Sequence, residues 1–94
     1  MSNIMMYRLV TGEFVVADVS DSDISDTVNM TNPIVLVPSQ QGIGMSPMLA
    51  YAASDSVEIS RDHILFETKP SSDIESEFRR IFSGIIVQSS SLIN

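Results

Sequence analysis

Apolar residues gather in short runs along the first two thirds of the chain, and clusters of polar turn residues separate these runs. The runs are rich in Val, Ile and Phe, which favour β-strands. Five strands are therefore predicted, over residues 5–10, 14–19, 27–38, 45–53 and 57–66. Because the connections are short, the predicted fold class is mainly β, with one five-stranded, strongly bent antiparallel sheet that forms a small open barrel.

The second run, Phe14–Val19, is apolar at nearly every position. A strand with one solvent-exposed face alternates apolar and polar residues instead. We therefore expect this strand to face the core on one side and either a helix or a neighbouring copy on the other. Thr11 and Gly12 predict the turn that leads into it.

The third run, residues 27–38, is the longest, and Asn32 and Pro33 interrupt it. Proline has no N–H to donate to a ladder, so Pro33 predicts a sheet edge, a bulge or a bend. A long strand bent in its middle is one way to close a small barrel.

After Pro70 the spacing of the apolar residues becomes helical. The residues on this apolar face are Ile74, Phe78, Ile81, Phe82 and Ile85. Ser72 and Glu75 have the capping-box spacing of a helix start, and Gly84 is the predicted stop. One C-terminal α-helix is therefore predicted over residues 72–83, followed by a flexible tail over residues 85–94.

The length of 94 residues suits one domain, so residues 1–94 are expected to fold as a single unit. Twelve Asp and Glu against five Lys and Arg give a net charge of −7. Broad binding of nucleic acid needs a basic surface, so this charge argues against it and leaves only a local site open. No apolar run approaches the ~18 residues of a membrane span, and the first residues do not resemble a signal peptide. We therefore expect a cytoplasmic protein without membrane contact.

Asp62 and His63 form the one adjacent pair of an acid and an imidazole, and His63 is the sole histidine. A single histidine does not supply a His-based metal cluster. Neighbours on a strand point to opposite faces, which makes this pair a poor proton relay, and Ser60 lacks the setting of an activated nucleophile. The acidic stretch 20–26 lacks the central Gly and closing Glu of a calcium loop. We expect no enzymatic activity, no metal and no cofactor.

Arg79 and Arg80 form a basic pair on the predicted helix. Together with Arg8 and Lys69 they would build a basic patch. Glu75 stands four residues before Arg79, however, and an ion pair at this spacing is the interpretation that we favour.

Four stretches of the chain resemble one family in their order and spacing. They are "YRLVTGEFVVADV" (residues 7–19), "NPIVLVPSQQG" (32–42), "MSPMLAYA" (45–52) and "VEISRDHILFETKP" (57–70). Together they resemble the Sm-like (LSm, Hfq-like) proteins, whose fold is an SH3-type small open barrel. The resemblance is greatest to small Sm-like proteins of tailed phages and marine viral sequences.

Two motifs carry this resemblance. Residues 9–12 are similar to the first Sm motif, in which a turn glycine joins the first two strands. Residues 57–64 are similar to the second motif, an apolar strand followed by an Arg-Gly-Asp/Asn-Asn turn. Here Ser60 stands at the position of the base-stacking arginine, and Arg61 replaces the glycine. The predicted helix follows the sheet, whereas Sm proteins usually carry one before it.

The resemblance implies a cyclic homo-oligomer of about five to seven copies, joined through the open edges of the sheet. It also implies single-stranded RNA as a ligand. Arg61, Asp62 and His63 would lie on a turn that faces the pore, where Arg61 and His63 contact phosphates or stack on a base. Secondary contacts would come from Asn29, Arg79 and Arg80.

Two alternatives stay open. The turn at residues 61–63 can instead hold the last strand in place, through an ion pair between subunits. The ring can instead be a non-catalytic adaptor that binds host or phage proteins, because an acidic ring repels nucleic acid. For a phage-encoded protein, the compartment is the cytoplasm of the host cell.

Overall fold

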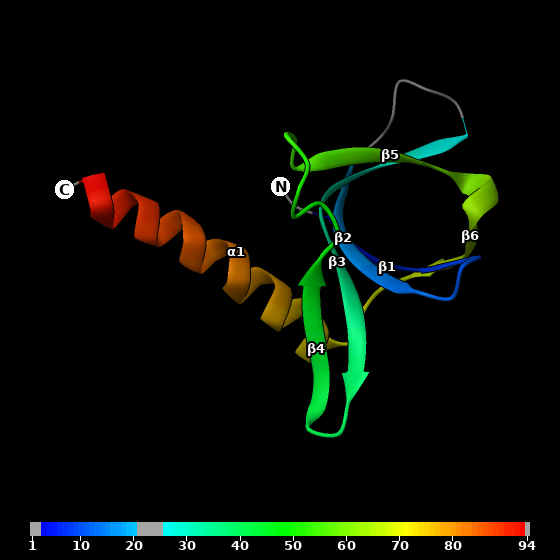
Figure 1. Ribbon diagram of the computed structural model, residues 1–94, viewed down its shortest axis with the longest axis horizontal. Helices are drawn as coiled ribbons and strands as arrows, with labels where there is room; N and C mark the ends of the chain where they lie inside the picture. Colours follow the sequence, from blue (N-terminus) through cyan, green and yellow to red (C-terminus); the bar gives the residue numbers. More distant parts are fainter. Residues whose placement is uncertain (1–2, 21–25, 94) are drawn as a thin grey trace.

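The described part of the chain contains six strands, a short 3-10 helix and one long α-helix. The computed structural model describes residues 3–20 and 26–93, with side chains as far as residue 82. Its elements are β1 (Ile4–Leu9), β2 (Phe14–Ser20), β3 (Thr27–Ser39), β4 (Gly42–Pro47), β5 (Ser56–Ser60), η1 (Arg61–His63), β6 (Ile64–Thr68) and α1 (Ser72–Ile93) (Figure 1). Most of the acidic stretch predicted as a loop, residues 21–25, lies outside the described residues.

Every ladder of the sheet is antiparallel, which confirms a mainly β chain with one C-terminal helix. The strand order is β4-β3-β2-β1-β6, and β5 pairs with the first part of β3. Within the described residues no ladder joins β5 to β6, so the sheet is not closed. The predicted barrel stays a prediction.

The prediction of five strands is wrong, because the fifth predicted strand is two strands, and the fourth has other bounds than predicted. The fourth, predicted over residues 45–53, ends at Pro47, and the N–H of Met48 then donates to the carbonyl oxygen of Pro33 at 2.9 Å. The fifth, predicted over residues 57–66, is divided by η1 into β5 and β6. At this division the N–H of Asp62 donates to the Oγ of Ser60 at 3.3 Å, which turns the chain.

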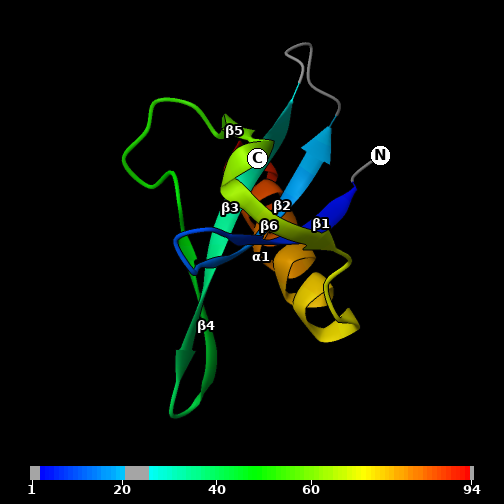
Figure 2. The same ribbon diagram turned by 90° about the vertical axis from the view of Figure 1, so that its right-hand side faces the viewer.

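β2 is buried on both faces, as its run of apolar residues predicts. Val15 and Ala17 belong to one core cluster, and Val16 belongs to a second. The buried members of the first cluster are Tyr7, Leu9, Val15, Ala17, Val28 and Met30. Those of the second are Ile4, Val16, Ile34 and Phe78. Phe78 lies on α1, so the helix covers the second face of β2 (Figure 2).

β3 changes its ladder partner at Asn32 and Pro33. It pairs with β5 as far as Thr31 and with β4 from Ile34 onward. On its other side, Val16 and Asp18 of β2 pair with Ile34 and Thr31, so β3 carries one extra residue there. This confirms the bulge predicted from Pro33, since a residue without an N–H is tolerated where a ladder is interrupted.

Asn32 adopts a left-handed backbone conformation at this bulge, with φ of 54°. A β-branched residue disfavours that conformation, whereas glycine adopts it freely. We expect Asn32→Val to lower the free energy of unfolding by about 1–2 kcal/mol. Urea unfolding followed by circular dichroism measures this, with Asn32→Gly as the control. Equal losses in both variants would contradict the role of the backbone angle.

The cap of α1 lies one residue earlier than the capping pattern predicts. The Oγ of Ser71 accepts a hydrogen bond from the N–H of Ile74 at 3.4 Å, and its carbonyl oxygen accepts one from the N–H of Glu75 at 2.9 Å. Ser71 therefore occupies the cap position that was predicted for Ser72.

The end of α1 lies much later than predicted. The helix continues through Gly84 to Ile93, so the predicted stop at Gly84 is wrong and residues 85–93 are helical. A glycine inside a helix costs only about 1 kcal/mol, which the neighbouring residues can offset. Figure 1 shows the later turns of α1 leading away from the strands. In the described residues, no helix combines the length and apolar character that crossing a membrane requires.

Candidate functional site

The turn formed by η1 presents three consecutive polar side chains to solvent. Arg61, Asp62 and His63 are all exposed. Their main chain is fixed from both sides: the N–H of Arg61 donates to the carbonyl of Asp26 at 2.8 Å, and the carbonyl of His63 accepts from the N–H of Val10 at 2.9 Å. The turn thus holds β6 in place through its backbone, while its cationic and imidazole side chains stay accessible to a ligand.

A buried phenol lies close to this turn. The hydroxyl of Tyr7, a fully buried residue, donates a hydrogen bond to the carboxylate of Glu67 on β6. Burial raises the pKa of the Tyr7 phenol above its ordinary value, and the hydrogen bond to Glu67 and the charge of Glu67 raise that pKa further. The positive charge of Arg61 lowers the same pKa, and its effect is the smallest of the four. The arrangement connects β1, β6 and η1.

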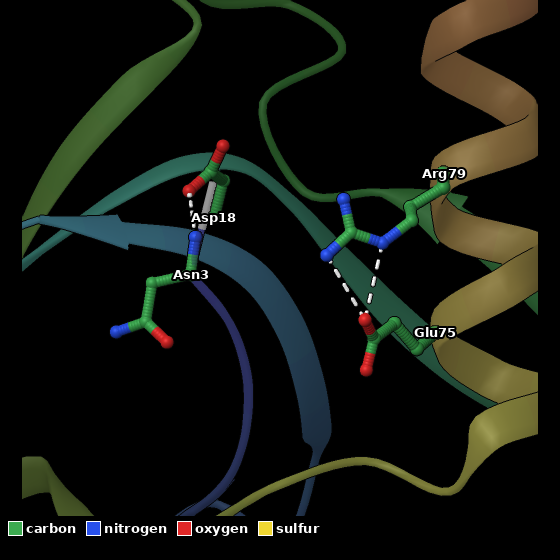
Figure 3. A network of polar contacts seen from close by, with 4 residues as sticks. All are labelled: Asn3, Asp18, Glu75 and Arg79. Carbon is green, nitrogen blue, oxygen red and sulfur yellow. Dashed lines mark hydrogen bonds and ion pairs between the residues drawn. The ribbon is translucent and has the colours of Figure 1, made fainter. Parts of the chain in front are cut away.

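The secondary candidates have other partners in the structure. The Nδ2 of Asn29 donates to the Oγ of Ser20 at 2.9 Å, which joins β2 to β3. Arg79 donates from Nε at 3.1 Å and from Nη2 at 2.9 Å to one carboxylate oxygen of Glu75, which confirms the predicted ion pair (Figure 3).

Arg80 is paired in the same way, with Glu77. The hydrogen bond from Arg80 holds the pKa of the Glu77 carboxyl below its usual value. The guanidinium carbon of Arg8 lies 4.8 Å from the ring centroid of Phe14, a cation–π distance. Arg8, Arg79 and Arg80 therefore each have a partner within the chain. This weakens the case for a basic patch formed by these arginines and Lys69.

A cavity that the sequence did not predict lies where β3 changes partner. Its volume is about 360 Å³. Its walls come from the bulge at residues 32–34, from Met45 and Pro47 of β4, from the loop between β4 and β5, and from Ile81 and Phe82 of α1. Three segments that are distant in the sequence form it, residues 32–34, 45–55 and 81–82, so no local motif signals it. We call it the bulge pocket.

The loop between β4 and β5, residues 48–55, is fixed at both ends. The N–H of Met48 donates to the carbonyl of Pro33 at 2.9 Å, and the N–H of Asn32 donates to the carbonyl of Asp55 at 2.7 Å. Both ends are thus attached to adjacent residues of the bulge. At the middle of this loop Tyr51 is fully exposed (103%).

The described residues hold no group of three or more His, Cys, Asp or Glu side chains that suits a metal ion. In the comparisons with known proteins, no family model matches the chain, and none of the curated proteins matches it.

Proposed function

We propose that the chain is a non-catalytic Sm-like module that assembles into a ring and binds single-stranded RNA at η1. The observation that carries this proposal is the exposed pair Arg61 and His63 on a turn whose main chain is fixed at both ends. Because the main chain of the turn is already fixed, only the two side chains have to be ordered when a ligand binds.

The ladder order supports a curled, barrel-like sheet. β5 and β6 are the outermost members of the series β5-β3-β2-β1-β6, and only the three residues of η1 separate them in the chain. Five flat strands side by side would place the two outer ones about 19 Å apart. The connection from Ser60 to Ile64 spans at most about 14 Å. A curled sheet brings the two outer strands close enough for this short connection to join them.

The edges of the sheet support self-assembly. In the described ladders, β4 pairs only with β3, and β6 pairs only with β1. Both edge strands carry exposed apolar side chains, Ile43 on β4 and Leu65 on β6. Open edges with apolar side chains favour pairing between copies, and head-to-tail contacts of this kind form a ring when the rotation between copies closes. We propose a ring of about five to seven copies.

The chemistry of η1 supports a local RNA contact. Arg61 suits a phosphate, and His63 suits stacking against an unpaired base. The net charge of −7 limits nucleic acid to such a site, because the rest of the surface repels it.

A second candidate function is an adaptor ring that binds phage or host proteins. The observation that favours it is the pairing of Arg79 with Glu75 and of Arg80 with Glu77. These two arginines are already paired on the helix, and the chain as a whole keeps its net charge of −7. A ring multiplies the charge of each copy and so disfavours long polyanions.

Light scattering tests the assembly. We expect a mass of several copies at micromolar protein, and we expect Ile43→Lys and Leu65→Lys each to reduce it, because a charge on an edge strand blocks pairing. Val10→Lys is the matched control, since Val10 is also an exposed apolar residue but lies outside the edge strands. A monomer mass for the unmodified chain would remove the ring from the proposal.

Fluorescence anisotropy with uridine-rich and adenine-rich oligonucleotides at low salt tests the RNA site. We expect the double variant Arg61→Ala/His63→Ala to weaken binding about tenfold or more, since a stacking contact and a phosphate contact are lost. Arg80→Ala is the matched control, because it removes the same charge from a residue already paired with Glu77. Absence of RNA binding, or equal binding by the double variant, would reject the site and leave the adaptor function.

A further inference from the structure

The loop of residues 48–55 combines a rigid attachment with an exposed aromatic tip. Its two ends are hydrogen-bonded to Pro33 and Asn32, and a further bond from the N–H of Ala52 to the carbonyl of Leu49 at 3.1 Å makes a turn around Tyr51. Figure 2 shows the loop as the green segment that stands away from the strands between β4 and β5. Tyr51 is as exposed there as in an extended peptide. A large aromatic side chain held in this way is suited to a contact outside its own chain.

The bulge pocket lies at the base of the same loop. Leu49, Ala52 and Ala53, the neighbours of Tyr51, form part of its wall. The exposed side chain of Tyr51, which we call the knob, and the pocket are therefore only a few residues apart along one loop. This is the arrangement that a two-fold contact requires, in which each copy offers the same pair of surfaces to the other.

We propose that Tyr51 of one copy occupies the bulge pocket of a second copy, and that the second copy does the same in return. The contact does not use the open main-chain edges of β4 and β6. Met45 and Pro47 of β4 do line the pocket, so the two-fold contact lies beside one ring edge without using its main-chain groups. The ring and the two-fold contact are therefore tested separately.

The chemistry of the pocket suits a phenol. Its volume of about 360 Å³ is at the small end of the range for ligand pockets, roughly 300–1,000 Å³, and matches one aromatic side chain with part of its loop. Its walls are mostly apolar, with Ile81 and Phe82 of α1 available to pack against a ring. A phenol hydroxyl also needs a polar partner when it is buried. Asn32, Ser54 and Asp55 supply such groups in the pocket wall.

The size of the contact indicates a weak association. Each tyrosine buries about 150–250 Å². Two of them stay well below the roughly 1,200 Å² of a standard stable interface. Both copies carry a charge of −7, so their repulsion opposes the contact. Added salt screens this repulsion and should strengthen the association, whereas salt weakens RNA binding.

Sedimentation velocity between about 1 µM and about 1 mM protein tests the contact, since this range covers weak interfaces. We expect Tyr51→Ala to weaken the two-fold association about tenfold or more, as for a central aromatic residue in a pocket. Its fold is not at risk, because the side chain is fully exposed. Val37→Ala is the matched control, since it truncates an exposed apolar side chain that does not line the pocket. The measurement is made in the Ile43→Lys variant, in which we expect ring assembly to be reduced.

A mixing experiment separates the knob from the pocket. Ala53→Leu narrows the pocket and keeps Tyr51, while Tyr51→Ala keeps the pocket and loses the knob. Each variant alone should associate weakly, and their mixture should associate more strongly, because one knob and one pocket remain. Equal association of Tyr51→Ala and the unmodified chain would overturn the proposal, as would a mixture no stronger than its components.

The small molecule p-cresol, which has the ring and hydroxyl of a tyrosine side chain, gives a direct readout. In amide NMR spectra of Tyr51→Ala we expect p-cresol to shift signals of Met45, Leu49 and Ala53, which line the pocket. In the unmodified chain it should dissociate the pair. Binding of p-cresol without any effect on self-association would overturn the second copy as the occupant and leave a site for small phenols.

Discussion

Phe78→Ala is expected to lower the free energy of unfolding by about 3–5 kcal/mol, the usual cost of removing a buried phenylalanine. Phe78 is a buried residue of α1 and belongs to the same core cluster as Val16 and Ile34. Its ring also lies 4.8 Å from that of Phe82, so an aromatic pair is lost as well. Without Phe78 the second apolar face of β2 is left partly open. Urea unfolding followed by circular dichroism measures the loss.

The matched control is Phe66→Ala, which makes the same chemical change at a side chain that is 44% exposed. We expect it to cost much less than Phe78→Ala, because its ring keeps contact with water in the folded state. A loss at Phe78 as small as that at Phe66 would mean that α1 contributes little to the fold.

Alkaline pH is expected to destabilise the protein through Tyr7. The folded state raises the pKa of this phenol, so above about pH 10 the unfolded chain releases the proton first. The stabilisation is complete below that pH and is lost as the pH rises toward the folded pKa. One proton corresponds to a slope of about 1.4 kcal/mol of unfolding free energy per pH unit.

Tyr7→Phe should remove this slope, and at neutral pH it should cost only about 1 kcal/mol for the lost hydrogen bond to Glu67. Tyr51→Phe is the control, because it alters a side chain without burial and should keep the slope. Urea unfolding at several pH values between about 9 and 12 gives the result. An unchanged slope in Tyr7→Phe would assign the alkaline loss to other groups.

Local patterns predicted the features that local chemistry decides. Gly12, with φ of 104°, forms the expected turn between β1 and β2, and Pro33 marks the expected bulge. The ion pair of Glu75 and Arg79 follows from helical spacing alone. The two buried faces of β2 follow from its unbroken apolar run.

Tertiary contacts decided the features that the sequence did not predict. The run at residues 48–53 is apolar, which is why a strand was predicted there, but three of its six residues are Ala, which strands disfavour. Hydrogen bonds at residues 48 and 55 attach it to Pro33 and Asn32 as a loop. The bulge pocket forms from segments that no motif connects. The turn at residues 61–63 was predicted. The hydrogen bond between Tyr7 and Glu67 was not, because these two residues are 60 positions apart in the chain.

The attachment of both loop ends to the bulge also determines where this chain can accept insertions. The loop of residues 48–55 leaves and re-enters the sheet at two adjacent residues, so its length does not affect the register of β4 or β5. Lengthening such a closed loop costs little, about 0.6 kcal/mol for each doubling. Exposed loop tips are also where insertions are best tolerated. The position of Tyr51 is therefore one where evolution or protein design can insert new recognition sequences without altering the β-sheet.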